Sequence, residues 1–169
     1  MILRRDRRLP EPLAAHLAAR DAPLASAELA DGTWAVVARA ALAVVGPSGI
    51  VVRSPWHEVE RGTWDGDESV LTVTWVDGVR APLELKVHDA PSAERFTRAL
   101  RERVQSSLVH SESAELPGGA IVMVHIRRDE DGALFSQVTA RGRLRDDAEE
   151  RRLVDEMERH ARAAVGLTT

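Results

Sequence analysis

Residues 70–87, VLTVTWVDGVRAPLELKV, carry the pattern that decides the fold class. Apolar residues alternate with threonine up to Trp75, and they alternate with charged residues from Leu83 to Val87. This period of two is typical of strands that bury one face. The dipeptide Asp77-Gly78 between the two runs is a hairpin turn signal. The stretch therefore predicts two antiparallel strands joined in a hairpin.

Short strands of the same kind are predicted upstream, from residue 24 onward. Gly46-Pro47-Ser48-Gly49 has turn chemistry, because proline presets φ and glycine permits a positive φ. In SPWHEVERGTWDGDE (residues 54–68), a bulge at Gly62 is expected to return Trp64 to the core side. Asp65-Gly66-Asp67 is then a hairpin turn. In total the region predicts about seven short strands, which is an all-β pattern.

A helical period replaces the strand pattern after residue 88. Apolar residues recur every three or four positions and predict one amphipathic helix over 91–107. They are Ala93, Phe96, Leu100 and Val104. Residues 109–119 are mostly polar and contain Pro-Gly-Gly, which predicts a linker.

Residues 120–169 predict a ββα extension. The strand at 121–126 is apolar on both faces, which indicates burial on both sides. The turn at 129–132 leads to a second strand, and Asp146 and Asp147 open a final helix. Its apolar stripe is Leu153, Met157, Ala161 and Ala164. Because about fifty residues are few for an independent core, we expect this unit to pack on the first domain or across a homodimer.

The composition is that of a globular protein. Of 169 residues, 44% are hydrophobic and 30% are charged. The net charge of −4 provides no basic field, so nucleic acid is not an expected partner. The absence of cysteine excludes disulfides and cysteine-ligated zinc.

Residues 1–23 are predicted to form a separate N-terminal segment. Their basic start and the run LAAHLAA resemble a secretory signal, but polar residues interrupt the apolar stretch: His16, Arg20 and Asp21. A short helix over 11–20 is expected instead, with Leu13 and Leu17 on one face. No run reaches the ~18 apolar residues of a membrane helix, so a cytoplasmic location is expected.

The order of seven antiparallel strands and one amphipathic helix, over residues 24–108, resembles the pleckstrin-homology-like (PH-like) fold. The run Pro55-Trp56-His57-Glu58-Val59 is similar to a strand start of bacterial PH-like proteins. The helix end LRERVQSSLV is similar to the end of that domain in small actinobacterial proteins of unassigned function. The resemblance implies a seven-stranded antiparallel barrel closed by a C-terminal helix. With the extension, the expected class is α+β.

The resemblance also implies a binding module that recognises lipids, peptides or proteins. Lipid-binding members resemble one another in a first hairpin rich in lysine and arginine. The corresponding hairpin here carries Arg39 alone. A phosphoinositide site is therefore not expected, and protein–protein contact is favoured.

The sequence contains no complete catalytic or metal-binding motif. His57-Glu58 lacks the second histidine of a zinc helix, because residue 61 is arginine. The acids at 65–68 lack the glycine of a calcium loop. We therefore expect no catalytic residue, no metal and no cofactor. A histidine–carboxylate site at His57 or His88 is the enzymatic alternative.

The sequence thus predicts a non-catalytic bacterial interaction protein. Of the four tryptophans, Trp56 is the one most expected to be partly exposed and, with His57, is the candidate partner contact, since tryptophan is enriched at binding hot spots. The favoured interpretation of Trp56, however, is that it covers an open end of the barrel. The other tryptophans are predicted to lie in the core: Trp34, Trp64 and Trp75. The second predicted function is contact with an anionic membrane or acidic partner through Arg4, Arg5, Arg7 and Arg8.

Overall fold

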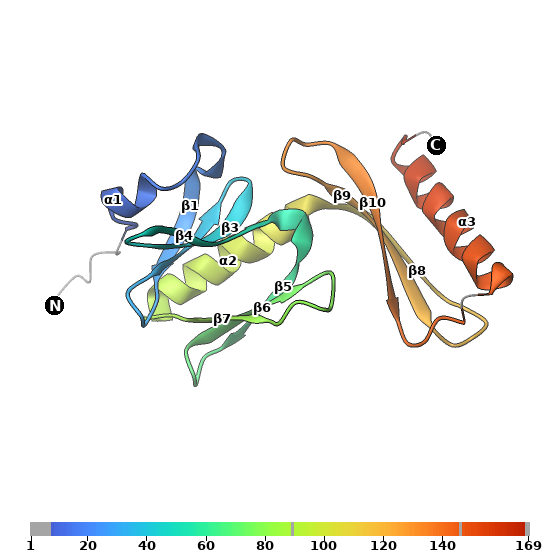
Figure 1. The fold of residues 1–169 in the computed structure, drawn as a ribbon, viewed down its shortest axis with the longest axis horizontal. Coiled ribbons are helices and arrows are strands. Elements are labelled where there is room, and N and C mark those ends of the chain that lie inside the picture. The colour runs from blue at the N-terminus through green and yellow to red at the C-terminus, as the bar shows by residue number, and fades with distance from the viewer. Residues whose placement is uncertain (1–7, 89, 146, 168–169) are drawn as a thin grey trace. The chain divides into compact units, whose positions relative to one another are not determined.

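The computed structural model describes residues 8–88, 90–145 and 147–167 (Figure 1). The chain divides into two compact units, with unit 1 ending at Gln105 and unit 2 beginning at Ser106. The described residues form ten strands in three antiparallel sheets, together with three α-helices. The class is α+β, as predicted. Among the described residues, no helix combines the length and apolar character that crossing a bilayer requires.

Unit 1 contains two antiparallel sheets. The first has the order β1 (Pro23–Glu28), β2 (Trp34–Ala38), β3 (Ala41–Gly46) and β4 (Gly49–Pro55). The second has the order β5 (Val59–Asp65), β6 (Val70–Trp75) and β7 (Leu83–Lys86). The turns predicted at residues 46–49 and 65–67 lie between β3 and β4 and between β5 and β6.

The predicted closed barrel is wrong, because the two sheets remain separate. Pro55 ends β4, and a 3₁₀ turn, η2 (Trp56–Glu58), follows before β5 begins. Proline has no backbone N–H to continue a ladder, and the 3₁₀ turn is too tightly wound to extend one. An isolated bridge between Leu29 and Val87 connects β1 and β7 at one corner.

One hydrophobic core lies against both sheets and α2 (Ala90–Ser107). The helix confirms the predicted amphipathic segment. Its buried residues pack with the inward faces of the strands: Ala93, Phe96 and Leu100. Asp89, whose residue type and place in the sequence predict a cap for this helix, lies outside the described residues.

A bulge in β5 brings Trp64 back toward the core, as the alternation requires. The register shift lies between Val59 and Arg61, so the bulge precedes Gly62 instead of occurring at it. Gly62 faces α2, since a Cβ at this position would lie 2.8 Å from Leu100 Cδ2. Glycine is required there for the close approach of the helix, and the bulge places it on the core side.

The N-terminal segment covers the outer face of the first sheet. The apolar residues of that face are completely buried: Val36, Ala38, Ala43 and Val45. Three leucines of the segment pack on them: Leu9, Leu13 and Leu17. The predicted helix is shorter than expected, with α1 over Glu11–Ala14 and a 3₁₀ turn, η1, over Ala19–Asp21. Asp21 is fully buried and accepts two hydrogen bonds from Arg53 of β4, at 2.8 and 3.0 Å.

Unit 2 consists of three strands and one helix. The sheet order is β10 (Leu134–Arg141), β9 (Ile121–Arg128) and β8 (Leu108–Glu115), and α3 (Ala148–Ala164) packs on one face. The predicted linker at 109–119 is therefore wrong, because most of it forms β8. Its polar alternation hid the strand, since an edge strand needs few apolar residues.

The core of unit 2 lies between β9 and α3. Val122, Val124 and Ile126 are buried against α3. On the opposite face of β9, Met123 and His125 are partly buried and Ile121 is exposed. Of the predicted α3 stripe, Leu153, Met157 and Ala161 face the core, whereas Ala164 is exposed at the helix end. Asp147 caps α3 by accepting from the Glu150 N–H at 2.8 Å, and Asp146 lies outside the described residues.

Candidate functional site

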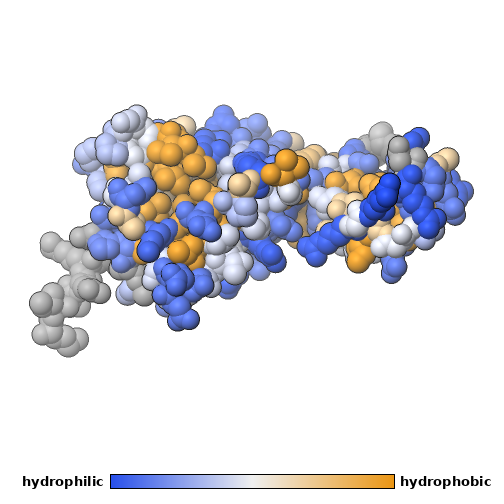
Figure 2. All heavy atoms as spheres, turned by 60° about the horizontal axis from the view of Figure 1, so that its bottom comes forward, coloured by the Kyte–Doolittle hydropathy of each residue, from blue (hydrophilic) through white to orange (hydrophobic). Residues whose placement is uncertain are grey.

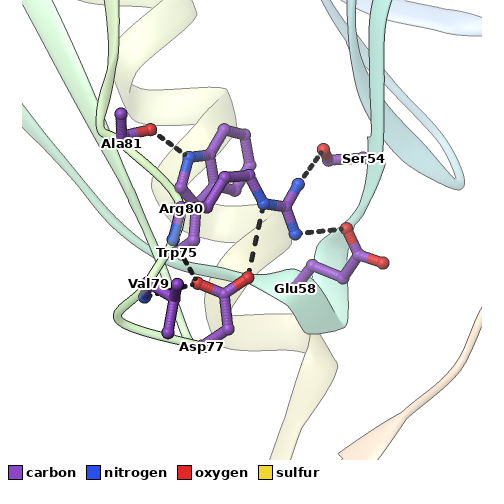
Figure 3. A network of polar contacts seen from close by, with 7 residues as sticks. All are labelled: Ser54, Glu58, Trp75, Asp77, Val79, Arg80 and Ala81. Carbon is purple, nitrogen blue, oxygen red and sulfur yellow. Dashed lines mark hydrogen bonds and ion pairs between the residues drawn. The ribbon is translucent and has the colours of Figure 1, made fainter.

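A network of polar contacts surrounds Arg80, in the loop between β6 and β7 (Figure 3). We call Ser54, Glu58, Trp75, Asp77 and Arg80 the Arg80 cluster. The Arg80 guanidinium donates to Ser54 Oγ at 3.1 Å, to Glu58 Oε2 at 3.0 Å and, more weakly, to Asp77 Oδ2 at 3.4 Å. The cluster thereby links the end of β4, η2 and the β6–β7 loop.

The Arg80 guanidinium stacks on the ring of Trp75. The Arg80 Cζ atom lies 4.3 Å from the centroid of a Trp75 ring, which is the geometry of a cation–π contact. The Trp75 indole N–H donates to the Ala81 carbonyl at 2.9 Å. Because Trp75 is buried in the core, its orientation is determined by packing, and Arg80 stacks on a rigid surface.

The β6–β7 loop is shaped by Asp77. Its Oδ1 accepts hydrogen bonds from the Val79 and Arg80 N–H groups, at 3.0 and 2.9 Å. Such aspartate turns stabilise a loop without help from other elements. These bonds leave the Val79 side chain 91% exposed at the tip.

The charges of the cluster compensate one another. The hydrogen bond and charge of Glu58 raise the pKa of Arg80. Backbone hydrogen bonds from Arg80 and Val79 lower the pKa of Asp77. Both shifts favour the charged forms of Arg80 and Asp77, and the arginine is held in place while its side chain remains partly exposed.

The structure places in this site the residues that flank the predicted contacts Trp56 and His57. Ser54 and Glu58 contact Arg80. Trp56 is only 4% exposed, and its indole N–H donates to the Ala38 carbonyl at 3.0 Å. Partial exposure of Trp56, the less favoured of the two interpretations, is wrong, because this hydrogen bond and the core contacts hold the ring inside. His57 is partly buried in η2.

Arg80 was missed in the sequence because its partners are distant in the chain. Asp77-Gly78 predicts a turn, but the arginine that follows it has no sequence signal connecting it to residues 54 and 58. The buried tryptophans Trp34 and Trp75 confirm their predicted core positions, and Trp64 packs partly buried against the core.

The remaining predicted contacts lie elsewhere. Arg4, Arg5 and Arg7 are outside the described residues, and Arg8 is exposed. His88 is exposed where β7 meets the end of β1, and its backbone N–H donates to the Glu28 carbonyl at 2.8 Å. Across residues 8–88, 90–145 and 147–167, no group of three histidine, aspartate or glutamate residues can hold a metal ion.

Unit 2 contains a second group of ionisable residues, between β8 and α3. Glu112 is 2.7 Å from His110 Nε2 and 2.9 Å from His160 Nδ1. These hydrogen bonds lower the pKa of Glu112, with the contact to His110 the larger cause. Since the pair to His160 joins a strand to a helix, this group attaches α3 to the sheet.

The opposite sheet face carries a serine–histidine pair. Ser111 Oγ lies 2.9 Å from His125 Nδ1. A serine nucleophile needs a base oriented by a third group and donors for an oxyanion. Ser111 and His125 stand opposite each other in the β8–β9 register, so the pair forms a cross-strand contact between these strands. Comparison of the chain with family models, with curated proteins and with solved structures found no match.

Proposed function

We propose that the chain is a non-catalytic interaction protein that binds a protein partner through the Arg80 cluster and the exposed Val79 beside it. One observation carries the proposal. An arginine is held on a tryptophan face at the surface, next to an apolar side chain that is 91% exposed. Arginine and tryptophan are the residues most enriched in binding hot spots.

Preorganisation favours binding at this site. The aspartate turn and the three polar contacts of Arg80 hold its side chain before a partner arrives. Binding of a partner therefore costs little conformational entropy at Arg80. Ordering a free arginine side chain on binding would cost about 0.5–1.5 kcal/mol. Glu58 and Asp77 add acceptors at the rim, which suits a partner with basic or amide groups.

A PH-like fold for unit 1 belongs to the same proposal. It is supported by the four-stranded and three-stranded antiparallel sheets and by the eighteen-residue helix that follows them. Two departures accompany it: the open corner between β4 and β5, and the N-terminal segment on the outer face. An experimental structure of residues 8–105 with a strand order or connection unlike that of PH-like domains would contradict this part.

The test is affinity capture with a matched pair of variants. Val79→Asp places a charge in the proposed contact, whereas Val51→Asp does so at another exposed valine, on β4. Figure 2 shows hydrophobic residues at the surface among hydrophilic ones, so a control for non-specific hydrophobic adsorption is needed. We expect one protein to be retained at high salt, and Val79→Asp alone to reduce its capture by roughly tenfold.

The same experiment addresses the membrane alternative. Vesicles containing anionic lipid are added at low and high salt, with a variant in which the four N-terminal arginines are replaced by glutamine. Binding that occurs only to vesicles, disappears at high salt and requires those arginines would refute the protein-partner proposal.

A further inference from the structure

The β10 strand is an edge whose residues 134–140 lack the protective features of the other edges that the structure describes. Figure 1 shows it beside β9, with α3 against the sheet. β10 pairs with β9 over eight successive residues without a register shift. From Leu134 to Ala140 it has no charged residue, no proline and no glycine. Its phenylalanine, valine and threonine favour strand structure.

The other described edge strands each carry a known device against edge-to-edge pairing. β1 begins at Pro23 and has a register shift, and β4 has Arg53, Pro55 and a shift. β5 has a bulge beside Glu60 and Arg61. β7 is four residues long and contains Glu84 and Lys86, and β8 has a shift near Leu108 as well as Glu112 and Glu115. Charges, prolines, bulges and shortness all discourage an added strand.

The charges beyond the two ends of β10 are opposite in sign. The turn before the strand contains Asp129, Glu130 and Asp131, and Arg141 ends the strand with Arg143 and Arg145 beyond it. A two-fold axis that pairs β10 with the β10 of a second copy runs the strands antiparallel. The acidic end of each strand then meets the basic end of the other. A parallel arrangement would place like charges together, which disfavours it.

Side-chain alternation determines which residues meet at the centre. Val138 pairs with Val124, which is buried under α3, so Val138 lies on the α3 side and is 40% exposed. A pairing that keeps each sheet face continuous places even-numbered residues opposite even-numbered ones. The two Val138 side chains therefore lie opposite or next to each other on the α3 side. Association would cover apolar surface that a single copy leaves in water.

From this combination we infer that β10 is a self-association site, through which two copies form one continuous six-stranded sheet. The inference is independent of the proposed function, because it concerns unit 2 and not the Arg80 cluster. A strand-edge interface is small, so the dimer is expected to be weak, with a dissociation constant of about 1–100 µM.

The experiment is sedimentation of the full chain over a concentration series, with a matched pair of variants. Val138→Lys places like charges near each other at the proposed centre, and Val109→Lys makes the same change on β8 at a valine that is 39% exposed. We expect the wild type to dimerise, Val138→Lys to raise the dissociation constant by roughly tenfold or more, and Val109→Lys to leave it within about twofold. Far-UV circular dichroism checks that both variants fold.

A charge exchange provides a second test that leaves the strand intact. Arg143→Glu is expected to weaken the dimer, and Arg143→Glu combined with Asp131→Arg is expected to restore it, with both effects reduced at high salt. A wild type that stays monomeric at about 300 µM overturns the inference. So does a dimer that Val138→Lys does not weaken or that Val109→Lys weakens equally. If Val138→Lys does not fold, an unchanged dimer in Arg143→Glu overturns it.

Discussion

Replacing Gly62 with alanine tests how closely α2 approaches β5. The added Cβ would lie 2.8 Å from Leu100 Cδ2 and 3.4 Å from Leu71 Cδ1. Real Cβ atoms do not approach another heavy atom to 2.8 Å, so Leu100 has to move. Both leucines are at most 1% exposed, and neither can turn toward solvent. One extra methyl group in so closely packed a site costs about 1–3 kcal/mol.

Gly46→Ala is the matched control. Gly46 also lies in a strand without a positive φ, but its Cβ would meet neighbours at 3.5 and 3.6 Å, which is ordinary contact. Alanine there reduces the entropy of the unfolded chain, and we expect a change between neutral and a stabilisation of about 1 kcal/mol. Opposite signs of the stability change at the two strand glycines would show that close packing, and not the loss of a glycine as such, determines the effect of Gly62→Ala.

The measurement is denaturant unfolding followed by tryptophan fluorescence. All four tryptophans are in unit 1, so the signal reports that unit alone. Leu100→Ala removes the clash along with core contacts, and a double-mutant cycle with Gly62→Ala should then show a coupling of at least about 1 kcal/mol. Equal stability of Gly62→Ala and Gly46→Ala, or additive effects in the cycle, would refute the argument.

Three further measurements test polar contacts of the two units. Trp56→Phe leaves the buried Ala38 carbonyl without its donor and should lower the free energy of unfolding by about 1–3 kcal/mol, measured with the three other tryptophans. The buried Glu150 carboxylate accepts hydrogen bonds from the backbone N–H groups of residues 118 and 145. Glu150→Gln should therefore speed amide hydrogen exchange at these two groups, and unchanged exchange would contradict this. The pKa of Glu112 is lowered, so its stabilisation is present above its ordinary value of 4.5 and is lost as pH falls through the folded value. An NMR titration should therefore find its midpoint below 4.5, and a midpoint above 4.5 would show that the contacts to His110 and His160 do not favour the carboxylate.

The sequence predicted a contact at Trp56 and His57, which lie between two members of the Arg80 cluster, Ser54 and Glu58, but it predicted no member of the cluster itself. The stretch at 54–58 attracts attention because it combines a histidine, an acid and a tryptophan. Its partner Arg80 does not, because an arginine after a hairpin turn is common on any surface. The distance of 22 residues between Glu58 and Arg80 closes only when β4, η2 and the β6–β7 loop come together. No local pattern encodes that meeting.

The burial of Trp56 could not be predicted for the same reason, because it depends on a contact with a distant part of the chain. A tryptophan after proline at a strand start can face either way. The deciding contact is the Ala38 carbonyl, eighteen residues earlier in the chain. The outward face of the first sheet is a further case, since Leu9, Leu13 and Leu17 show a helical period but do not indicate which surface they cover.

The sequence by itself determined the elements whose signal is local. Periods of two and of three to four residues identify β6, β7, α2 and α3, because one buried face imposes them. Turn residues determined where the hairpins reverse. Only the tertiary structure decided that β8 is a strand, that the two sheets of unit 1 stay separate and that Arg80 stacks on Trp75. The reason is physical: an edge strand, a sheet boundary and a polar cluster depend on free-energy differences between distant segments, to which no single window of sequence is sensitive.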